Sequence, residues 1–164
     1  MVLILGSMPG LASLAAFQYY AHPQNGFWRI AAELLGFDAS APYRERTRAL
    51  KTARIALWDV LRSCAREGSL DAGIAKDTEV ANDFRKFFRA HKRITHVFFN
   101  GAKAQACFTR HVLRGMDSGS ISFARLPSTS PANASLSFER KLEAWRAIIL
   151  SQAGSPPRRE GETK

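Results

Sequence analysis

The sequence has few cysteines and no long apolar run. Only Cys64 and Cys107 are present among 164 residues, too few to supply the four thiolates of an iron–sulfur cluster. We expect both to be reduced, buried, small apolar side chains. No apolar stretch approaches the roughly 20 residues of a membrane-spanning helix, and residues 2–5 lack the basic region and the length of a secretory signal. We therefore expect a cytoplasmic protein with no membrane partner.

Acidic side chains are also scarce. The chain has 14 Asp plus Glu against 24 Lys plus Arg, a net charge of +10 and a pI near 10.3. An excess of this size favours a polyanionic partner, with nucleic acid first. A generally basic protein without such a partner remains the alternative. With 46% hydrophobic residues and a mean hydropathy of −0.19, the chain is expected to fold as one globular domain.

Short apolar segments alternate with segments of helical spacing. The predicted strands cover residues 2–5, 55–58, 94–99 and 120–126, and the predicted helices cover residues 27–35, 42–53, 82–90, 102–113 and a final helix after Ser137. Asn82 is expected to cap the helix at 82–90. This alternation predicts an α/β fold, a three-layer α/β/α arrangement around a central, mainly parallel four-stranded sheet. We expect one domain over residues 1–153 and a disordered polar tail over 154–164.

Polar or glycine-containing loops follow three of the predicted strands. The loop Gly-Ser-Met-Pro-Gly covers residues 6–10, Asn100-Gly101 follows the strand at 94–99, and a Ser/Pro-rich loop covers residues 127–133. The carboxyl ends of parallel strands meet at one edge of the sheet, where ligands bind. We therefore expect the three loops to form one site. The glycine spacing in the first loop matches neither a P-loop nor a dinucleotide fingerprint, and an ordinary strand-to-helix connection is the alternative.

The first loop and the residues after it carry a family resemblance. Gly-Ser-Met-Pro-Gly, followed by Tyr-Tyr-Ala-His-Pro-Gln-Asn-Gly-Phe-Trp at 19–28, resembles motif 1 of the uracil-DNA glycosylase superfamily, with its hypoxanthine-DNA glycosylase branch the nearest match. The resemblance covers all three loops. It implies a monofunctional DNA glycosylase that hydrolyses the N-glycosidic bond of deoxyinosine, with DNA as partner and with no metal or organic cofactor. We expect a monomer.

The resemblance also implies roles for individual side chains. Breaking an N-glycosidic bond requires an oriented water and donors for the charge that develops on the leaving base. Asn25 would position the water, Tyr20 would stack on the extruded base, and Asn100 would read the edge of that base. The structural alternatives are a helix-capping Asn25, a core aromatic at Tyr20 and an ordinary turn residue at Asn100. The first loop would complete the base site with Gly6, Ser7 and Met8.

Two positions depart from the family pattern. Met8 stands where several relatives carry the Asn or Asp that orients the water, and Leu126 stands where many carry a His that stabilises the leaving base. The third loop resembles motif 2, which contacts the DNA backbone and the minor groove. Its residues are Ser128, Thr129, Ser130, Pro131, Ala132 and Asn133. Neither Ala132 nor Asn133 is large enough to fill the emptied base stack, which predicts a preference for mismatched or open DNA.

Lys103 is a candidate for Schiff-base lyase chemistry because it follows the second loop. We expect it to be an exposed residue of a first helical turn, which favours monofunctional chemistry. Two other functions stay open. One is a glycosylase of the same fold that prefers uracil or xanthine, which the residues at Met8 and Leu126 disfavour. The other is a nucleic-acid-binding module without turnover, which the same two apolar residues favour.

Overall fold

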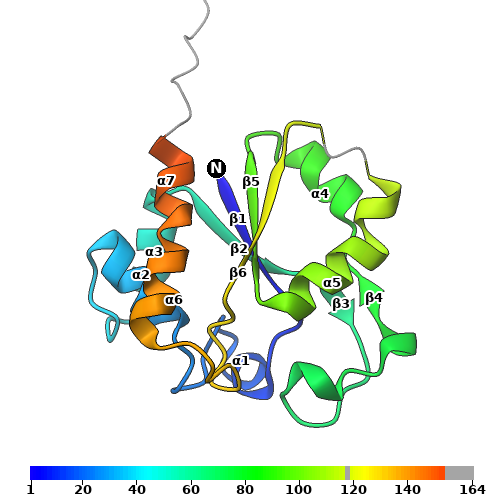
Figure 1. Ribbon diagram of the computed structural model, residues 1–164, viewed down its shortest axis with the longest axis horizontal. Helices are drawn as coiled ribbons and strands as arrows, with labels where there is room; N and C mark the ends of the chain where they lie inside the picture. The colour runs from blue at the N-terminus through cyan, green and yellow to red at the C-terminus, as the bar shows by residue number, and fades with distance from the viewer. Residues whose placement is uncertain (117–118, 154–164) are drawn as a thin grey trace, which may run out of the picture.

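A four-stranded parallel sheet forms the centre of the computed structural model, which describes residues 1–116 and 119–153. Its strands are β1 (Val2–Gly6), β2 (Ile55–Asp59), β5 (His96–Asn100) and β6 (Ser122–Leu126), in the order β2-β1-β5-β6. Helices cover both faces of the sheet (Figure 1). The predicted three-layer α/β/α fold is therefore confirmed, whereas the predicted tail at 154–164 lies outside the described residues.

The side chains of β1 alternate between two apolar cores. Val2 and Ile4 pack on one face of the sheet, while Leu3 and Leu5 pack on the other. A continuous apolar run is typical of a strand that is buried on both faces of a parallel sheet. Helices α2 (Phe27–Leu35), α3 (Tyr43–Thr52), α6 (Phe138–Trp145) and α7 (Ala147–Ala153) cover the first face. Helices α4 (Phe84–Ala90) and α5 (Ala102–His111) cover the second.

Several elements were not predicted from the sequence. Helix α1 (Leu11–Ala16) has only six residues, too few to show the apolar periodicity that marks a helix in a sequence. None of its residues is buried. Strands β3 (Leu61–Ser63) and β4 (Val80–Ala81) form a small antiparallel sheet. Three short 3-10 turns complete the elements: η1 (Asp71–Gly73), η2 (Lys76–Thr78) and η3 (Leu113–Gly115). The predicted last helix is divided into α6 and α7 at Arg146.

Two local predictions were wrong. Asp83 caps α4, because its Oδ1 accepts a hydrogen bond from the Lys86 amide at 2.9 Å. Asn82, one residue earlier, instead donates from Nδ2 to the Asp59 carbonyl at 2.9 Å. Cys107 is buried as expected, but Cys64 is only half-buried.

The strand order places the site. From β1 the chain passes to β2 on one side of it, and later to β5 on its other side. This reversal makes the carboxyl end of β1 the topological switch point of the sheet, the position at which open α/β sheets bind ligands. The first loop and helix α1 follow directly at this edge (Figure 1). The segment at 61–81, inserted between β2 and α4, reaches the same edge through η1.

Lys103 belongs to a charge cluster around a buried carboxylate. The Glu79 side chain is 0% exposed, and it accepts hydrogen bonds from Lys103 Nζ at 2.6 Å and Arg110 Nη1 at 2.7 Å. His111 Nε2 lies 2.7 Å from the same carboxylate. Burial acts to raise the pKa of Glu79, but these hydrogen bonds and charges lower it to about 2. The expectation of an exposed Lys103 is wrong, since its side chain is 21% exposed and ion-paired.

We expect Glu79→Gln to lower the free energy of unfolding by on the order of 2 kcal/mol at pH 7, because three cationic or titratable groups lose their common counter-charge. The folded pKa is below the ordinary value, so this stabilisation is present at neutral pH and is lost as the pH falls towards 2. Urea titrations of the wild type and of Glu79→Gln at pH 7 and pH 3 measure the difference in the free energy of unfolding. An equal effect of the substitution at both pH values would contradict the account.

Candidate active site

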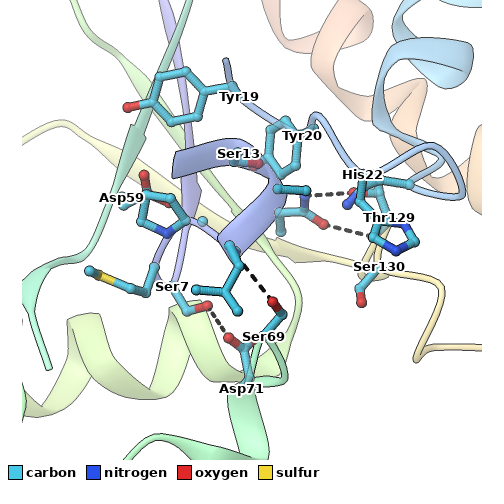
Figure 2. A pocket seen from close by; sticks show the side chains of 18 of the residues that line it. Ser7, Ser13, Tyr19, Tyr20, His22, Asp59, Ser69, Asp71, Thr129 and Ser130 are labelled. Atoms are coloured by element: carbon cyan, nitrogen blue, oxygen red, sulfur yellow. Dashed lines mark hydrogen bonds between the residues drawn. The ribbon is translucent and has the colours of Figure 1, made fainter. Parts of the chain in front are cut away.

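A pocket of about 680 Å³ opens at the carboxyl edge of the sheet. Its volume is in the range of small-molecule sites. The pocket brings together every residue predicted for the site, and Figure 2 shows several of them around the hollow. They are Gly6, Ser7, Met8, Tyr20, Asn25, Asn100, Ser128, Thr129, Ser130, Pro131, Ala132 and Asn133. The three loops therefore meet at one pocket, as their positions after parallel strands predicted.

Thr129 joins its own loop to the end of β5 and to the residue before α2. The amide of Asn100 pairs with it twice: Nδ2 donates to Thr129 Oγ1 at 2.8 Å, and Oδ1 accepts from the Thr129 backbone N–H at 2.9 Å. The Thr129 carbonyl accepts from the Gly26 N–H at 2.9 Å, which connects it to the start of α2. Thr129 is only 2% exposed, so we assign it to holding the loops. Base reading by Asn100 stays a prediction and has to use the hydrogen-bonding capacity that these bonds leave free.

Asn25 has the structural role that the sequence offered as an alternative. Its Oδ1 accepts a hydrogen bond from the Phe27 N–H at 3.0 Å, which satisfies one of the free amides at the start of α2. Its own N–H donates to the His22 carbonyl at 2.9 Å. Among the described residues, Asn25 Nδ2 has no hydrogen-bond partner, and the residue lines the pocket. The bonded oxygen fixes the amide, which leaves Nδ2 able to bind a water or a substrate.

Tyr20 is held at the pocket in a strained conformation. Its φ of 54° lies in the left-handed region, which is uncommon for a bulky residue and is concentrated at functional sites. One face of its ring stacks on Phe27, with centroids 4.2 Å apart. Burial raises the pKa of Tyr20, and so does the nearby Asp59, so the hydroxyl is neutral. Hydrogen bonds fix the flanking residues: Tyr19 N–H to Tyr43 Oη, Trp28 Nε1 to Tyr19 O, and Ala21 N–H to Ser13 Oγ. Stacking on a base stays a prediction.

The hydroxyl groups of the third loop shape the loop itself. Ser128 Oγ accepts from the Ser130 N–H at 3.2 Å, and Ser130 Oγ accepts from the Ala132 N–H at 3.3 Å. Asn133 Nδ2 donates to the Ser128 carbonyl at 3.1 Å. The loop is thus preorganised, with Ser128, Ser130 and Asn133 on the pocket lining. Their contact with DNA stays a prediction.

The segment that leads into the 3-10 turn η1 contributes two further groups to the pocket, Ser69 and Asp71. Ser7 Oγ donates to Asp71 Oδ1 at 2.5 Å, and the Leu11 N–H donates to Ser69 Oγ at 3.2 Å (Figure 2). Both bonds connect the first loop to residues about 60 positions later in the chain. Ser69 and Asp71 were not predicted for the site, because nothing in the sequence of 63–78 indicates that this segment folds back onto the first loop.

Asp59 lies at the base of the pocket. It is the last residue of β2 and pairs in register with Gly6 of β1. A side chain at Gly6 would overlap the Asp59 carboxylate and would come within 3.5 Å of the Tyr20 hydroxyl, so the glycine leaves room for both groups. Asp59 is 7% exposed, and its carboxylate makes no hydrogen bond within the described part of the chain. Burial and the charge of Asp71 raise the pKa of Asp59 to about 7, and Arg66 opposes the shift.

Apolar side chains form the rim of the pocket. Leu11 and Leu14 of α1, Phe17 after it and Leu70 are all exposed and line the opening. Phe17 is 92% exposed and has a φ of 52°. Exposed apolar groups that adjoin a pocket commonly mark a contact surface.

Comparison with known proteins identifies the family. The family model described as the uracil DNA glycosylase superfamily matches residues 1–150. The chain belongs to the uracil DNA glycosylase superfamily. It is 38% identical over 149 residues to a protein of Methanosarcina acetivorans named hypoxanthine DNA glycosylase, covering 90% of this chain and 89% of that one. A protein of the same name from Methanosarcina barkeri is 43% identical over 104 residues, 63% of this chain and 65% of that one.

A solved structure agrees with the assignment to this superfamily. The solution NMR structure of a candidate uracil DNA glycosylase from Methanosarcina acetivorans matches with a TM-score of 0.71 at 34% sequence identity, and the match covers 90% of each chain. Within residues 1–116 and 119–153, no cluster of three or more His, Cys, Asp or Glu is arranged to hold a metal ion. No helix of this described part is long and apolar enough to cross a membrane.

The two positions that the sequence marked as departures from the family pattern carry apolar side chains. Met8 lines the pocket with an apolar side chain, and Leu126, which is buried in the core, does not line it. Asp59, like Asp71, is an ionisable pocket residue that was not predicted from the sequence. The sequence did contain an indication of this position. Asp59 directly follows the apolar residues 55–58, just as Asn100 follows the predicted strand at 94–99. Both positions are carboxyl ends of parallel strands.

We expect Asp59→Asn to stabilise the protein at alkaline pH. A carboxyl whose folded pKa is raised costs stability once the pH exceeds its ordinary pKa, and the cost is complete above pH 7. The difference between the ordinary pKa of an Asp and a pKa of about 7 corresponds to an upper limit of roughly 4 kcal/mol. In thermal and urea unfolding, the wild type and Asp59→Asn should therefore have similar free energies of unfolding at pH 3.5. At pH 8 the variant should have the larger free energy of unfolding. A variant that is less stable at pH 8 would show that the charged carboxylate is stabilised in the fold.

Proposed function

We propose that this protein is a monofunctional DNA glycosylase that hydrolyses the N-glycosidic bond of deoxyinosine and releases hypoxanthine, the first step of base-excision repair. The observation that carries the proposal is the convergence of the three strand-end loops on one pocket, with the Asn25 amide fixed at its lining. Two relatives that are named hypoxanthine DNA glycosylase support the base preference. The net charge of +10 suits a DNA substrate.

The pocket residues divide the reaction between them. Asn25 Nδ2 holds the water that attacks C1′ of the sugar, while Asn25 Oδ1 stays bonded to Phe27. Tyr20 presents its ring to the extruded base, and Asn100 meets the base edge. The third loop follows the DNA backbone through Ser128 and Ser130. No metal or organic cofactor takes part. The protein acts as a monomer in the compartment that contains the DNA, which we take to be the cytoplasm.

Abasic-site formation tests the proposal directly. Matched duplex, mismatched duplex and single-stranded oligonucleotides are prepared, each with one hypoxanthine, uracil or xanthine. We expect hypoxanthine release to exceed that of the other bases. Release of uracil or xanthine alone would assign another base preference. Binding without any abasic product would support a nucleic-acid-binding module without turnover, the alternative that Met8 and Leu126 favour.

Asn25→Ser separates the two roles of this residue. A serine hydroxyl can accept the hydrogen bond from the Phe27 N–H, so the start of α2 is preserved, but the side-chain N–H that would hold the water is lost. We expect single-turnover release of hypoxanthine to fall at least about 100-fold, with the melting temperature changed little. Gln24→Ala, an exposed neighbour in the same loop, is the matched control. Activity close to wild type in Asn25→Ser would restrict Asn25 to a structural role.

Phe17 supplies the large side chain that the third loop lacks. Phe17 is almost fully exposed, lines the pocket and has a left-handed backbone conformation directly after helix α1. Exposure of an aromatic ring to water is unfavourable, and stacking on a base stabilises the complex by about 1–3 kcal/mol. We therefore assign Phe17 to stacking against bases next to the extruded nucleotide.

We expect Phe17→Ala to weaken binding to hypoxanthine-containing duplex by about 10-fold, the lower part of the range for one stacking contact. It should also reduce the fluorescence increase of a 2-aminopurine placed beside the hypoxanthine. Leu150→Ala, another exposed apolar residue but on α7, is the control. Unchanged affinity and unchanged fluorescence in Phe17→Ala would exclude a DNA contact by this residue.

A further inference from the structure

The departing base requires a proton donor or hydrogen-bond donor. When the bond between C1′ and N9 breaks, its electron pair stays with the purine, and a neutral acid that donates to the base lowers the barrier. Leu126 is apolar and lies in the core outside the pocket, so it offers the base no donor. Met8 does line the pocket, but a thioether donates no proton.

Asp59 is placed to take this role. It comes from the carboxyl end of β2, beside Gly6 and the Tyr20 hydroxyl, in the part of the pocket predicted to hold the base. Figure 2 shows it on the other side of the hollow from Thr129. Over nine-tenths of its surface is buried, and within residues 1–116 and 119–153 its carboxylate has no hydrogen-bond partner. Because Asp59 lines the pocket, a bound base would supply a hydrogen-bond partner for this carboxyl.

We propose that Asp59 is a catalytic acid that protonates the purine as it leaves. The inference rests on the proposed glycosylase function and names a further residue of its site. The C1′–N9 bond breaks, its electron pair leaves with the base, and the Asp59 proton moves to a ring nitrogen of that base. The water oxygen bonds to C1′ and its proton is released to solvent, from which Asp59 is protonated again. The sum is addition of one water across the glycosidic bond.

The surroundings keep Asp59 able to donate. The charged and titratable groups that act on it are Asp71 of η1, Arg66, and the hydroxyls of Tyr19 and Tyr20. Asp71 and burial disfavour its ionised form, while Arg66 favours that form, and the balance is a pKa of about 7. An acid is most effective when its pKa is near the working pH. A carboxyl that were ionised throughout this range would instead act as a base towards water.

The test is the pH dependence of single-turnover hypoxanthine release between pH 5.5 and 9. In the wild type we expect the rate to fall as the pH rises through about 7. Asp59→Asn should be slower by about 100-fold or more at pH 6 and should show no such fall. Asp71→Asn keeps an acceptor for Ser7 but removes the neighbouring charge, so the fall should move to lower pH. Asp77→Asn, exposed on η2, is the control with the wild-type profile.

Each outcome decides the matter. A wild-type profile and rate in Asp59→Asn would overturn the role of Asp59 and leave the proposed function intact. A wild-type rate that rises with pH, and a rise that Asp59→Asn abolishes, would make Asp59 a base for the water and overturn its role as an acid. No release from the wild type at any pH would overturn the proposed function together with this inference. If Asp59→Asn fails to fold, the pH profile of Asp71→Asn still tests the inference. A fall in rate that moves to lower pH supports the acid role of Asp59, and a fall at the wild-type pH contradicts it.

Discussion

The pairing of Asn100 with Thr129 is the interaction on which the site depends. Two hydrogen bonds join the end of β5 to the loop after β6, and the Thr129 carbonyl binds the N–H that precedes α2. Three segments far apart in the sequence thereby meet around one buried residue. Because the amide of Asn100 engages both a backbone N–H and a hydroxyl, a change of either partner leaves a buried polar group unsatisfied. The geometry of the pocket follows from this junction and from the parallel sheet that supports it.

The electrostatics of the pocket differ from those of the whole protein. The chain carries a net charge of +10, yet two carboxyls, Asp59 and Asp71, lie at the pocket. Two ionised carboxylates beside a site for DNA would repel the phosphate backbone. Burial and mutual repulsion resolve this conflict, because they favour the neutral form of Asp59. The same effect that limits repulsion of the substrate makes a proton available inside the pocket.

Much of the fold and of the pocket lining was predictable, because short-range patterns carry that information. The apolar residues of β1 predicted a central parallel strand, and Asn100 before Gly101 marked the end of β5. The residues that escaped prediction depend on long-range packing. Asp71 reaches the pocket only because the segment after β3 folds back onto Ser7, and the exposed Phe17 follows a six-residue helix that buries none of its residues. The cap of α4 was misplaced by one residue because Asn82 binds the Asp59 carbonyl instead.

Hydrogen–deuterium exchange on the complex with DNA is the most direct measurement of the central claim, that the three loops together form the DNA-facing surface. The oligonucleotide would carry a 2′-fluoro-deoxyinosine, in which the electronegative fluorine resists cleavage. We predict protection of residues 6–10, 17–28, 100–101 and 128–133, with little change in α4 and in the cluster around Glu79. Protection confined to α4 and α5, with the three loops unchanged, would contradict the account.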